Sequence, residues 1–279
     1  MKWLFVLLLA VIVFGGAAFF SYDLFVKPER TMRAEKSGEI PAEPVPDFSL
    51  PEFQAAAKLR QEGRLTEARD ALILLLQKYP NGLHTEEVKD LLGEVNTDIL
   101  LSDYHTPEKQ EYLVRRGDVL AKIAAKMKTT PELILRTNRL NNTMLRVGQV
   151  LQISRPDFSV FIQRKAQTVV LLNHGQFFKR YRVKTVKLSA RQPPRINTKV
   201  AEILAFRGGK RVGFGTKEYL GSTRWIRLNQ PGYFLFAEAD STHRDESGQP
   251  PPPGLGLAAS DMEELSSLVN TKTAVTITD

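Results

Sequence analysis

The sequence predicts an α+β multidomain protein with an N-terminal transmembrane helix, a helical hairpin spacer, a small βααβ unit and a mainly-β C-terminal region. Three observations lead to this fold class. The N-terminus is an uncharged apolar run, residues 53–95 repeat apolar side chains at helical spacing, and residues after 158 alternate apolar and polar side chains as strands do. With 279 residues and a hydrophobic share of 42%, the chain can hold more than one domain.

Residues 1–26 form the predicted membrane segment. The run from Trp3 to Phe20 carries no charged side chain, and at ~1.5 Å per residue a helix of this length spans about 27 Å, close to the thickness of a bilayer core. We expect a transmembrane anchor. The alternative is a cleaved signal peptide, with the small residues of segment 16–18 at the cleavage site. Both alternatives predict that the chain is exported.

A linker and a helical segment follow. Residues 27–51 contain five prolines among charged and small residues, which is typical of a stiff, extended linker. Residues 52–104 show helical apolar stripes, and one stretch is similar to a single tetratricopeptide repeat in its spacing of Ala56, Leu59, Ala68, Leu72 and Pro80. Because one repeat is too short for a solenoid, we expect a helical spacer; a peptide-binding groove is the alternative.

Residues 108–155 read as a complete βααβ unit. Tyr112 and Val114 alternate before a Gly-Asp turn, and a helical stripe begins at Leu120. Thr130 before Pro131 predicts the N-terminus of a second helix, because Thr caps helices and Pro suits the first helical position. A turn-rich stretch over 138–142 and a short apolar run over 150–153 complete the unit.

This ordered pattern resembles a LysM module over its whole length. The resemblance implies binding of N-acetylglucosamine-containing glycans, usually peptidoglycan or chitin, in a shallow groove between two loops. One departure is Val119, where the family usually carries Ser or Thr. The alternative is that these positions are ordinary caps and core. The glycan-binding residues implied by the resemblance are Gly117, Asp118, Val119, Leu120, Asn141, Asn142, Met144 and Leu145.

A basic stretch follows the module. From Phe158 to Ala201 there are ten Lys and Arg residues and no acidic residue, within a chain of net charge +8. No aromatic RNA-binding motif accompanies them, so on an exported chain they favour anionic envelope polymers or lipid headgroups over nucleic acid. A solvated surface is the alternative.

Residues 157–279 resemble the catalytic domain of YkuD-type L,D-transpeptidases, which cross-link peptidoglycan. The resemblance rests on a hairpin around residues 173–175, on the stretches 221–229 and 232–233, and on a final helix and strand, where Ser260 and Glu263 predict a capping box. That family uses a cysteine nucleophile, histidines and an arginine. In an ungapped alignment these positions carry Phe236, Pro252, Gly254 and Gly256, and the 279 residues contain no cysteine. Because a transpeptidase of this type needs a thiolate and a base, we expect the domain to be a catalytically inactive pseudoenzyme.

Other catalytic or metal chemistry has little support in the sequence. His243 lies between two aspartates in a polar loop without the strand–turn–helix context of a hydrolase triad. The other histidines are scattered, and no metal-ligand spacing exists, so we expect neither a cofactor nor a metal site.

The sequence therefore predicts a membrane-anchored protein of the bacterial cell envelope, with its domains on the periplasmic side and peptidoglycan as its partner. Nucleic acid is not an expected partner, and no protein partner is indicated. Two alternatives remain open. The chain could be an active cell-wall enzyme of atypical mechanism, or a scaffold that docks a protein through the loop Asp240–Gly256.

Overall fold

The computed structural model describes residues 48–102, 106–188, 192–239 and 245–279, and contacts join residues 49–279 in one unit. The predicted transmembrane helix of residues 1–26 and most of the predicted linker lie outside the described residues. Within them, none of the helices is long and apolar enough to cross a membrane. The predicted fold class is therefore corrected to α+β without a membrane-spanning helix in this part of the chain.

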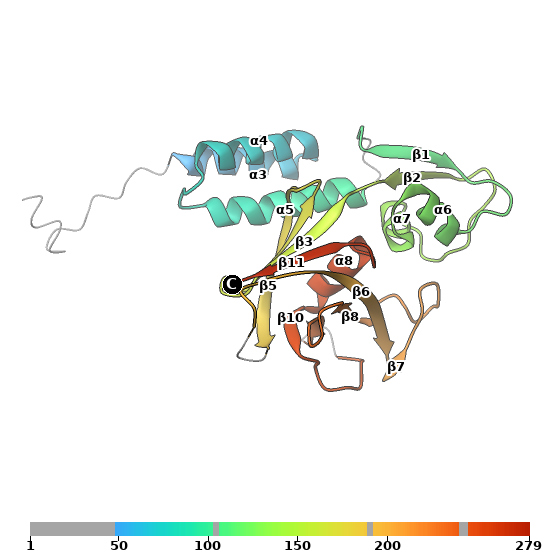
Figure 1. The fold of residues 1–279 in the computed structure, drawn as a ribbon. Coiled ribbons are helices and arrows are strands. Elements are labelled where there is room, and N and C mark those ends of the chain that lie inside the picture. The colour runs from blue at the N-terminus through green and yellow to red at the C-terminus, as the bar shows by residue number, and fades with distance from the viewer. Residues whose placement is uncertain (1–47, 103–105, 189–191, 240–244) are drawn as a thin grey trace, which may run out of the picture. The chain divides into compact units, whose positions relative to one another are not determined.

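Three antiparallel helices, and not a simple hairpin, make up the helical layer (Figure 1): α3 (Ser49–Gln61), α4 (Leu65–Lys78) and α5 (Thr85–Leu101). Apolar side chains at helical spacing, among them Ala68, Leu72 and Val95, are fully buried between the helices. The chain leaves α3 through Gly63, whose positive φ of 76° suits glycine. The similarity to a tetratricopeptide repeat stays a prediction.

The βααβ unit forms as the sequence predicts, from β1 (Lys109–Leu113), α6 (Leu120–Met127), α7 (Pro131–Thr137) and β2 (Val150–Ser154). The two strands pair antiparallel, with Tyr112 opposite Leu151. The Thr130 hydroxyl accepts a hydrogen bond from the Leu133 amide at 3.0 Å, which confirms the predicted N-cap of α7.

The C-terminal region is a nine-stranded sheet with one helix, α8 (Ala259–Leu268). The strand order is β11-β3-β4-β5-β10-β9-β8-β6-β7, and β11 also pairs with β6, which closes the sheet on itself. Met262 and Leu265 of α8 are fully buried against the sheet core. The predicted capping box is wrong, because α8 has Ala258 at its N-cap and no side-chain cap. The strands are β3 (Phe158–Gln163), β4 (Thr168–Asn173), β5 (Gln176–Lys187), β6 (Arg195–Arg207), β7 (Lys210–Arg211), β8 (Thr223–Leu228), β9 (Phe234–Glu238), β10 (Gly254–Ala258) and β11 (Ala274–Thr278).

Helix α5 packs directly on strand β5. A Cβ added at Gly93 would lie 3.2 Å from Lys179 Cα, so glycine allows the helix and the strand to approach closely. The Asn96 side-chain amide donates to the Phe178 carbonyl at 2.8 Å. The helical layer is therefore fastened to the C-terminal sheet by polar contacts as well as by apolar packing.

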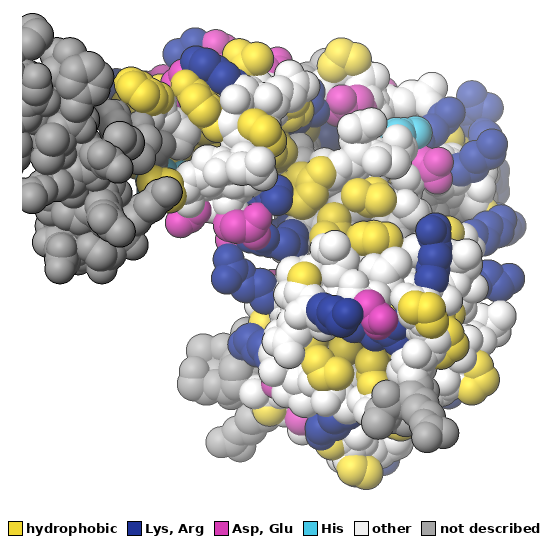
Figure 2. All heavy atoms as spheres, turned by 60° about the vertical axis from the view of Figure 1, so that its left-hand side comes forward, with side chains coloured by type: hydrophobic (Ala, Val, Ile, Leu, Met, Phe, Trp, Pro, Cys, Tyr) yellow, Lys and Arg dark blue, Asp and Glu magenta, His cyan; other side chains and the backbone are white. Residues whose placement is uncertain are grey.

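The acidic side chains of α5 neutralise part of the basic stretch. Lys179 lies 3.1 Å from Glu94, and Asp90 lies 2.5 Å from Arg180 and 2.6 Å from Arg182. Burial alone would lower the pKa of Lys179, but the nearby carboxylates of Glu264 and Glu94 outweigh this effect, and the pKa is raised. Figure 2 shows acidic side chains among the Lys and Arg side chains on one face of the molecule. Three of the ten basic side chains expected to face an anionic polymer are therefore paired with carboxylates of α5.

Candidate functional site

The first loop of the predicted groove connects β1 to α6, and Asp118 holds it together. The Asp118 carboxylate accepts hydrogen bonds from the Arg115 amide at 2.8 Å and from the Tyr112 hydroxyl at 2.9 Å. These bonds stabilise the charged form, and the pKa of Asp118 is lowered. Gly117 makes the turn possible, because its φ is +86°. Asp118 therefore supports the shape of the loop through these two hydrogen bonds.

Val119 and Leu120 differ in their availability to a ligand. Leu120, one of the glycan-binding residues implied by the resemblance, is only 2% exposed and packs with Ile123 in the core of the unit, so its side chain is not presented at the surface. Val119 is 49% exposed and occupies the N-cap of α6, where its side chain makes no capping bond. Ser or Thr at this position would cap α6, which gives a physical reason for the residue that the family usually carries.

The second loop follows α7. Met144 is 79% exposed, whereas Leu145 is partly buried against the core of the unit. The Asn142 side chain accepts a hydrogen bond from the Met144 amide at 3.0 Å, which orders the loop. Asn141 is exposed. Asn141, Asn142 and Met144 are all exposed, and Asn142 differs from the other two because its side-chain oxygen is engaged within the loop.

Asn141 and Asn142 line a cavity of about 220 Å³ that sequence reasoning missed. Its opposite wall comes from residues 213–220 of the C-terminal region, which we call the 213–220 segment. Phe214 and Leu220 of this segment are partly exposed. Apolar residues within a glycine-containing stretch were the signal available in the sequence, but nothing in the sequence places this loop beside residue 141.

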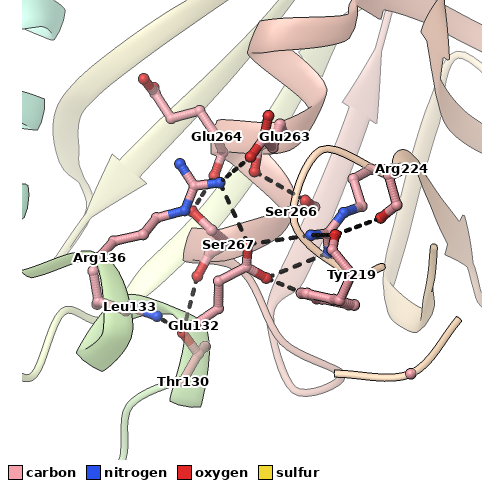
Figure 3. Close-up of polar contacts among 12 residues, drawn as sticks. Thr130, Glu132, Leu133, Arg136, Tyr219, Arg224, Glu263, Glu264, Ser266 and Ser267 are labelled. Atoms are coloured by element: carbon pink, nitrogen blue, oxygen red, sulfur yellow. Dashed lines mark hydrogen bonds and ion pairs between the residues drawn. The ribbon is translucent and has the colours of Figure 1, made fainter. Parts of the chain in front are cut away.

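A buried polar cluster fixes the LysM-like unit to the C-terminal sheet (Figure 3). Glu132 of α7 accepts a hydrogen bond from the Tyr219 hydroxyl at 2.7 Å and pairs with Arg224 at 3.4 Å. The Arg224 guanidinium lies 3.5 Å from the centre of the Tyr219 ring. Burial is the main cause of a raised pKa at Tyr219, and the Glu132 charge adds to it. Glu132 was not predicted to have a role, because helical periodicity cannot show a partner 92 residues away.

Two further bonds cross the same junction. Arg136 of α7 lies 2.8 Å from Glu263 of α8. The Thr130 hydroxyl donates to the Ser267 carbonyl at 2.9 Å while it caps α7. These contacts hold α7 against α8 and orient the second loop relative to the 213–220 segment.

The four positions aligned with catalytic residues lie on or next to the paired strands β9 and β10. Phe236 is 1% exposed and lies opposite Gly256 in the sheet. Gly254 has a φ of +148°, and a Cβ there would lie 2.0 Å from the Phe234 carbonyl oxygen. A Cβ at Gly256 would lie 2.5 Å from a carboxylate oxygen of Glu238. The Phe234 backbone thus excludes a side chain at Gly254, whereas at Gly256 the Glu238 side chain would have to move.

Pro252 lies in the segment that enters β10 and is partly buried. His243 lies outside the described residues. Among the residues that the structure describes, no group of three or more His, Cys, Asp or Glu side chains could hold a metal ion.

Comparisons with known proteins bear on both resemblances. Residues 112–154 match the family model of the LysM domain. No curated protein sequence matches the chain. Among solved structures, the chain is similar to an L,D-transpeptidase from Mycobacterium smegmatis, with 8% identity, a TM-score of 0.30, and coverage of 47% of this chain and 64% of that one.

Two further solved structures show a similarly distant match. For an L,D-transpeptidase (Yku) from Stackebrandtia nassauensis the identity is 18%, the TM-score 0.30, and the coverage 44% of this chain and 56% of that chain. A mutant L,D-transpeptidase from Enterococcus faecium has 13% identity and a TM-score of 0.30, and the match covers 48% of this chain and 57% of that chain. In all three cases the chain spans less than two thirds of the solved protein. The two resemblances seen in the sequence are thus both found, the first as a LysM domain over residues 112–154 and the second as a distant structural similarity to L,D-transpeptidases.

Proposed function

We propose that this chain binds N-acetylglucosamine-containing glycan, with bacterial peptidoglycan as the natural ligand, through its LysM domain. The observation that carries the proposal is the match to the LysM family over residues 112–154. It is supported by the two loops at one end of this domain, which present Val119, Asn141 and Met144 to solvent. A protein with this activity belongs at the cell wall.

The exposed groups suit a neutral sugar. The Asn141 amide can donate to and accept from an acetamido group, and Met144 can cover an apolar sugar face. Asp118 is committed to the Tyr112 hydroxyl and the Arg115 amide, so its role is to keep the first loop in shape. We assign recognition to Asn141 and Met144 and support of the loop to Asp118.

The C-terminal domain, in this proposal, does not catalyse acyl transfer. The 279 residues contain no cysteine, and a transpeptidase of the thiolate type has no other sulfur nucleophile. The crowding at Gly254 supports a scaffolding role for β10, because the Phe234 backbone leaves no room there for a reactive side chain. The domain instead positions the LysM loops through the cluster around Glu132.

Calorimetric titration of the chain with soluble N-acetylglucosamine oligomers tests the proposal. We expect saturable binding that Asn141→Ala weakens without lowering the melting temperature, since the Asn141 side chain is exposed. Asn229→Ala, at another exposed asparagine in the C-terminal region, serves as a control. If the wild type releases no heat and shows no spectral change with any oligomer, the proposed function is wrong.

A further inference from the structure

The cavity beside Asn141 has walls from two different parts of the chain. The LysM domain contributes Asn141, Asn142 and Thr143, and the 213–220 segment contributes Phe214 and Leu220. The two walls lie close together, because a Cβ added at Gly215 would lie 3.5 Å from Thr143 Cγ2. The cavity therefore lies between the second LysM loop and the 213–220 segment.

The 213–220 segment is ordered by its own hydrogen bonds. The Thr216 hydroxyl donates to the Gly213 carbonyl at 2.9 Å, and the Tyr219 amide donates to the Thr216 carbonyl at 3.2 Å. The Tyr219 hydroxyl in turn donates to Glu132 of the LysM domain at 2.7 Å. The segment is thus fixed to the domain whose loop it faces (Figure 3).

Phe214 is presented at this surface in a defined orientation. Its ring packs edge-on against the Tyr219 ring, with centroids 5.3 Å apart and planes at 82°. Phe214 nevertheless remains 36% exposed. An aromatic ring that is held from one side and open on the other can stack on the apolar face of a sugar at little cost in side-chain entropy.

A second and larger cavity, of about 540 Å³, adjoins the 213–220 segment. It shares Phe214 and Tyr219 with the first cavity, and its walls include Ile203, Val212 and Val269. Glu202 and Arg211 add polar groups at this cavity. Apolar side chains interspersed with hydroxyl, amide and charged groups suit a ligand that alternates apolar faces and hydroxyl edges, as a glycan does.

We propose that the 213–220 segment forms a second wall of the glycan-binding groove, with Phe214 as a stacking platform. This inference rests on the proposed function. The groove then takes an N-acetylglucosamine oligomer longer than the LysM loops alone can cover, with the sugar at Asn141 and a neighbouring sugar on Phe214. Specificity for polymer length comes from the C-terminal domain.

The test is titration of the full chain with a dimer and a pentamer of N-acetylglucosamine. Phe214→Ala should weaken binding of the pentamer roughly tenfold and leave the dimer almost unchanged, since only the longer oligomer reaches the ring. Phe214→Tyr keeps the ring and should restore most of the affinity. Leu83→Ala removes a more exposed apolar side chain far from the groove and should change the affinity for neither oligomer.

The outcomes separate the two proposals. Suppose that Asn141→Ala weakens the binding of both oligomers while Phe214→Ala binds both with the affinity of the wild type. The second wall is then disproved and the glycan-binding function stands. If the wild type binds neither oligomer, the proposed function fails and this inference fails with it. A Phe214→Ala protein whose melting temperature equals that of the wild type shows that any loss is local to the groove.

Discussion

Replacement of Glu132 by Gln should destabilise the protein strongly, because it leaves Arg224 as a buried charge without its carboxylate partner. The Arg224 side chain is fully buried and that of Glu132 is 6% exposed. Removal of one member of a buried ion pair costs about 3–5 kcal/mol. Arg224 keeps its bond to the Tyr219 carbonyl at 2.9 Å and its stacking on the Tyr219 ring, so we expect the lower end of that range, about 3 kcal/mol.

Urea unfolding followed by circular dichroism measures this change, and a thermal scan should show a fall of roughly 6–12 °C in melting temperature for a unit of this size. Glu67→Gln is the matched control. Glu67 pairs with Arg64 on an exposed helix surface, so the same chemical change there should have no measurable effect. The double variant Glu132→Leu with Arg224→Met replaces the pair by apolar groups and should recover much of the lost stability.

A free energy of unfolding for Glu132→Gln within about 0.5 kcal/mol of the wild type would refute this reasoning. It would mean that water or a rearranged neighbour satisfies Arg224. The LysM domain would then be less firmly fixed to the C-terminal sheet than the cluster implies.

Three further predictions concern the two loops and the strand pair. Val119→Thr should raise the free energy of unfolding by about 1 kcal/mol, because it supplies the missing N-cap of α6; an unchanged urea midpoint would contradict this. Asp118→Ala should lower stability at neutral pH. Because the folded pKa of Asp118 lies below its ordinary value of 3.8, its contribution is present above pH 3.8 and is lost as the pH falls through the folded pKa, so unfolding curves of the two proteins should converge in acid. Gly254→Cys should destabilise the β9–β10 pair, because its Cβ would overlap the Phe234 carbonyl, and intact mass should show no carbapenem adduct; a stable variant that forms an adduct would reopen the enzyme alternative.

The sequence was most informative where structure is local. The alternation before residue 117, the Thr130 cap and the two helical stripes predicted the LysM domain with its element order, because each depends on neighbours a few residues away. The sequence did not reveal that the Leu120 side chain is buried, since a residue at a loop boundary can equally be the first core position of a helix. Hydropathy alone also led to a transmembrane helix in the expected fold class, whereas no helix of the described residues could span a membrane.

Features that depend on distant pairs could not be predicted. The basic residues of β5 looked available to a polymer until α5 placed Asp90 and Glu94 against them, about 90 positions earlier in the chain. In the same way, no periodicity connects the 213–220 segment to Asn141, or Arg224 to Glu132. Such contacts arise from the closure of the sheet and the docking of the LysM domain on it, which a one-dimensional pattern does not contain.

Co-sedimentation with purified peptidoglycan sacculi tests the central claim most directly. The claim is that the LysM loops bind glycan and that charge is not the main attraction. We predict that the wild-type chain pellets with sacculi at both low and high salt, and that the double variant Asn141→Ala with Met144→Ala remains in the supernatant while it melts as the wild type does. Two results would contradict the claim. One is that the wild-type protein stays in the supernatant at low salt. The other is that the wild type pellets only at low salt and the double variant pellets equally well.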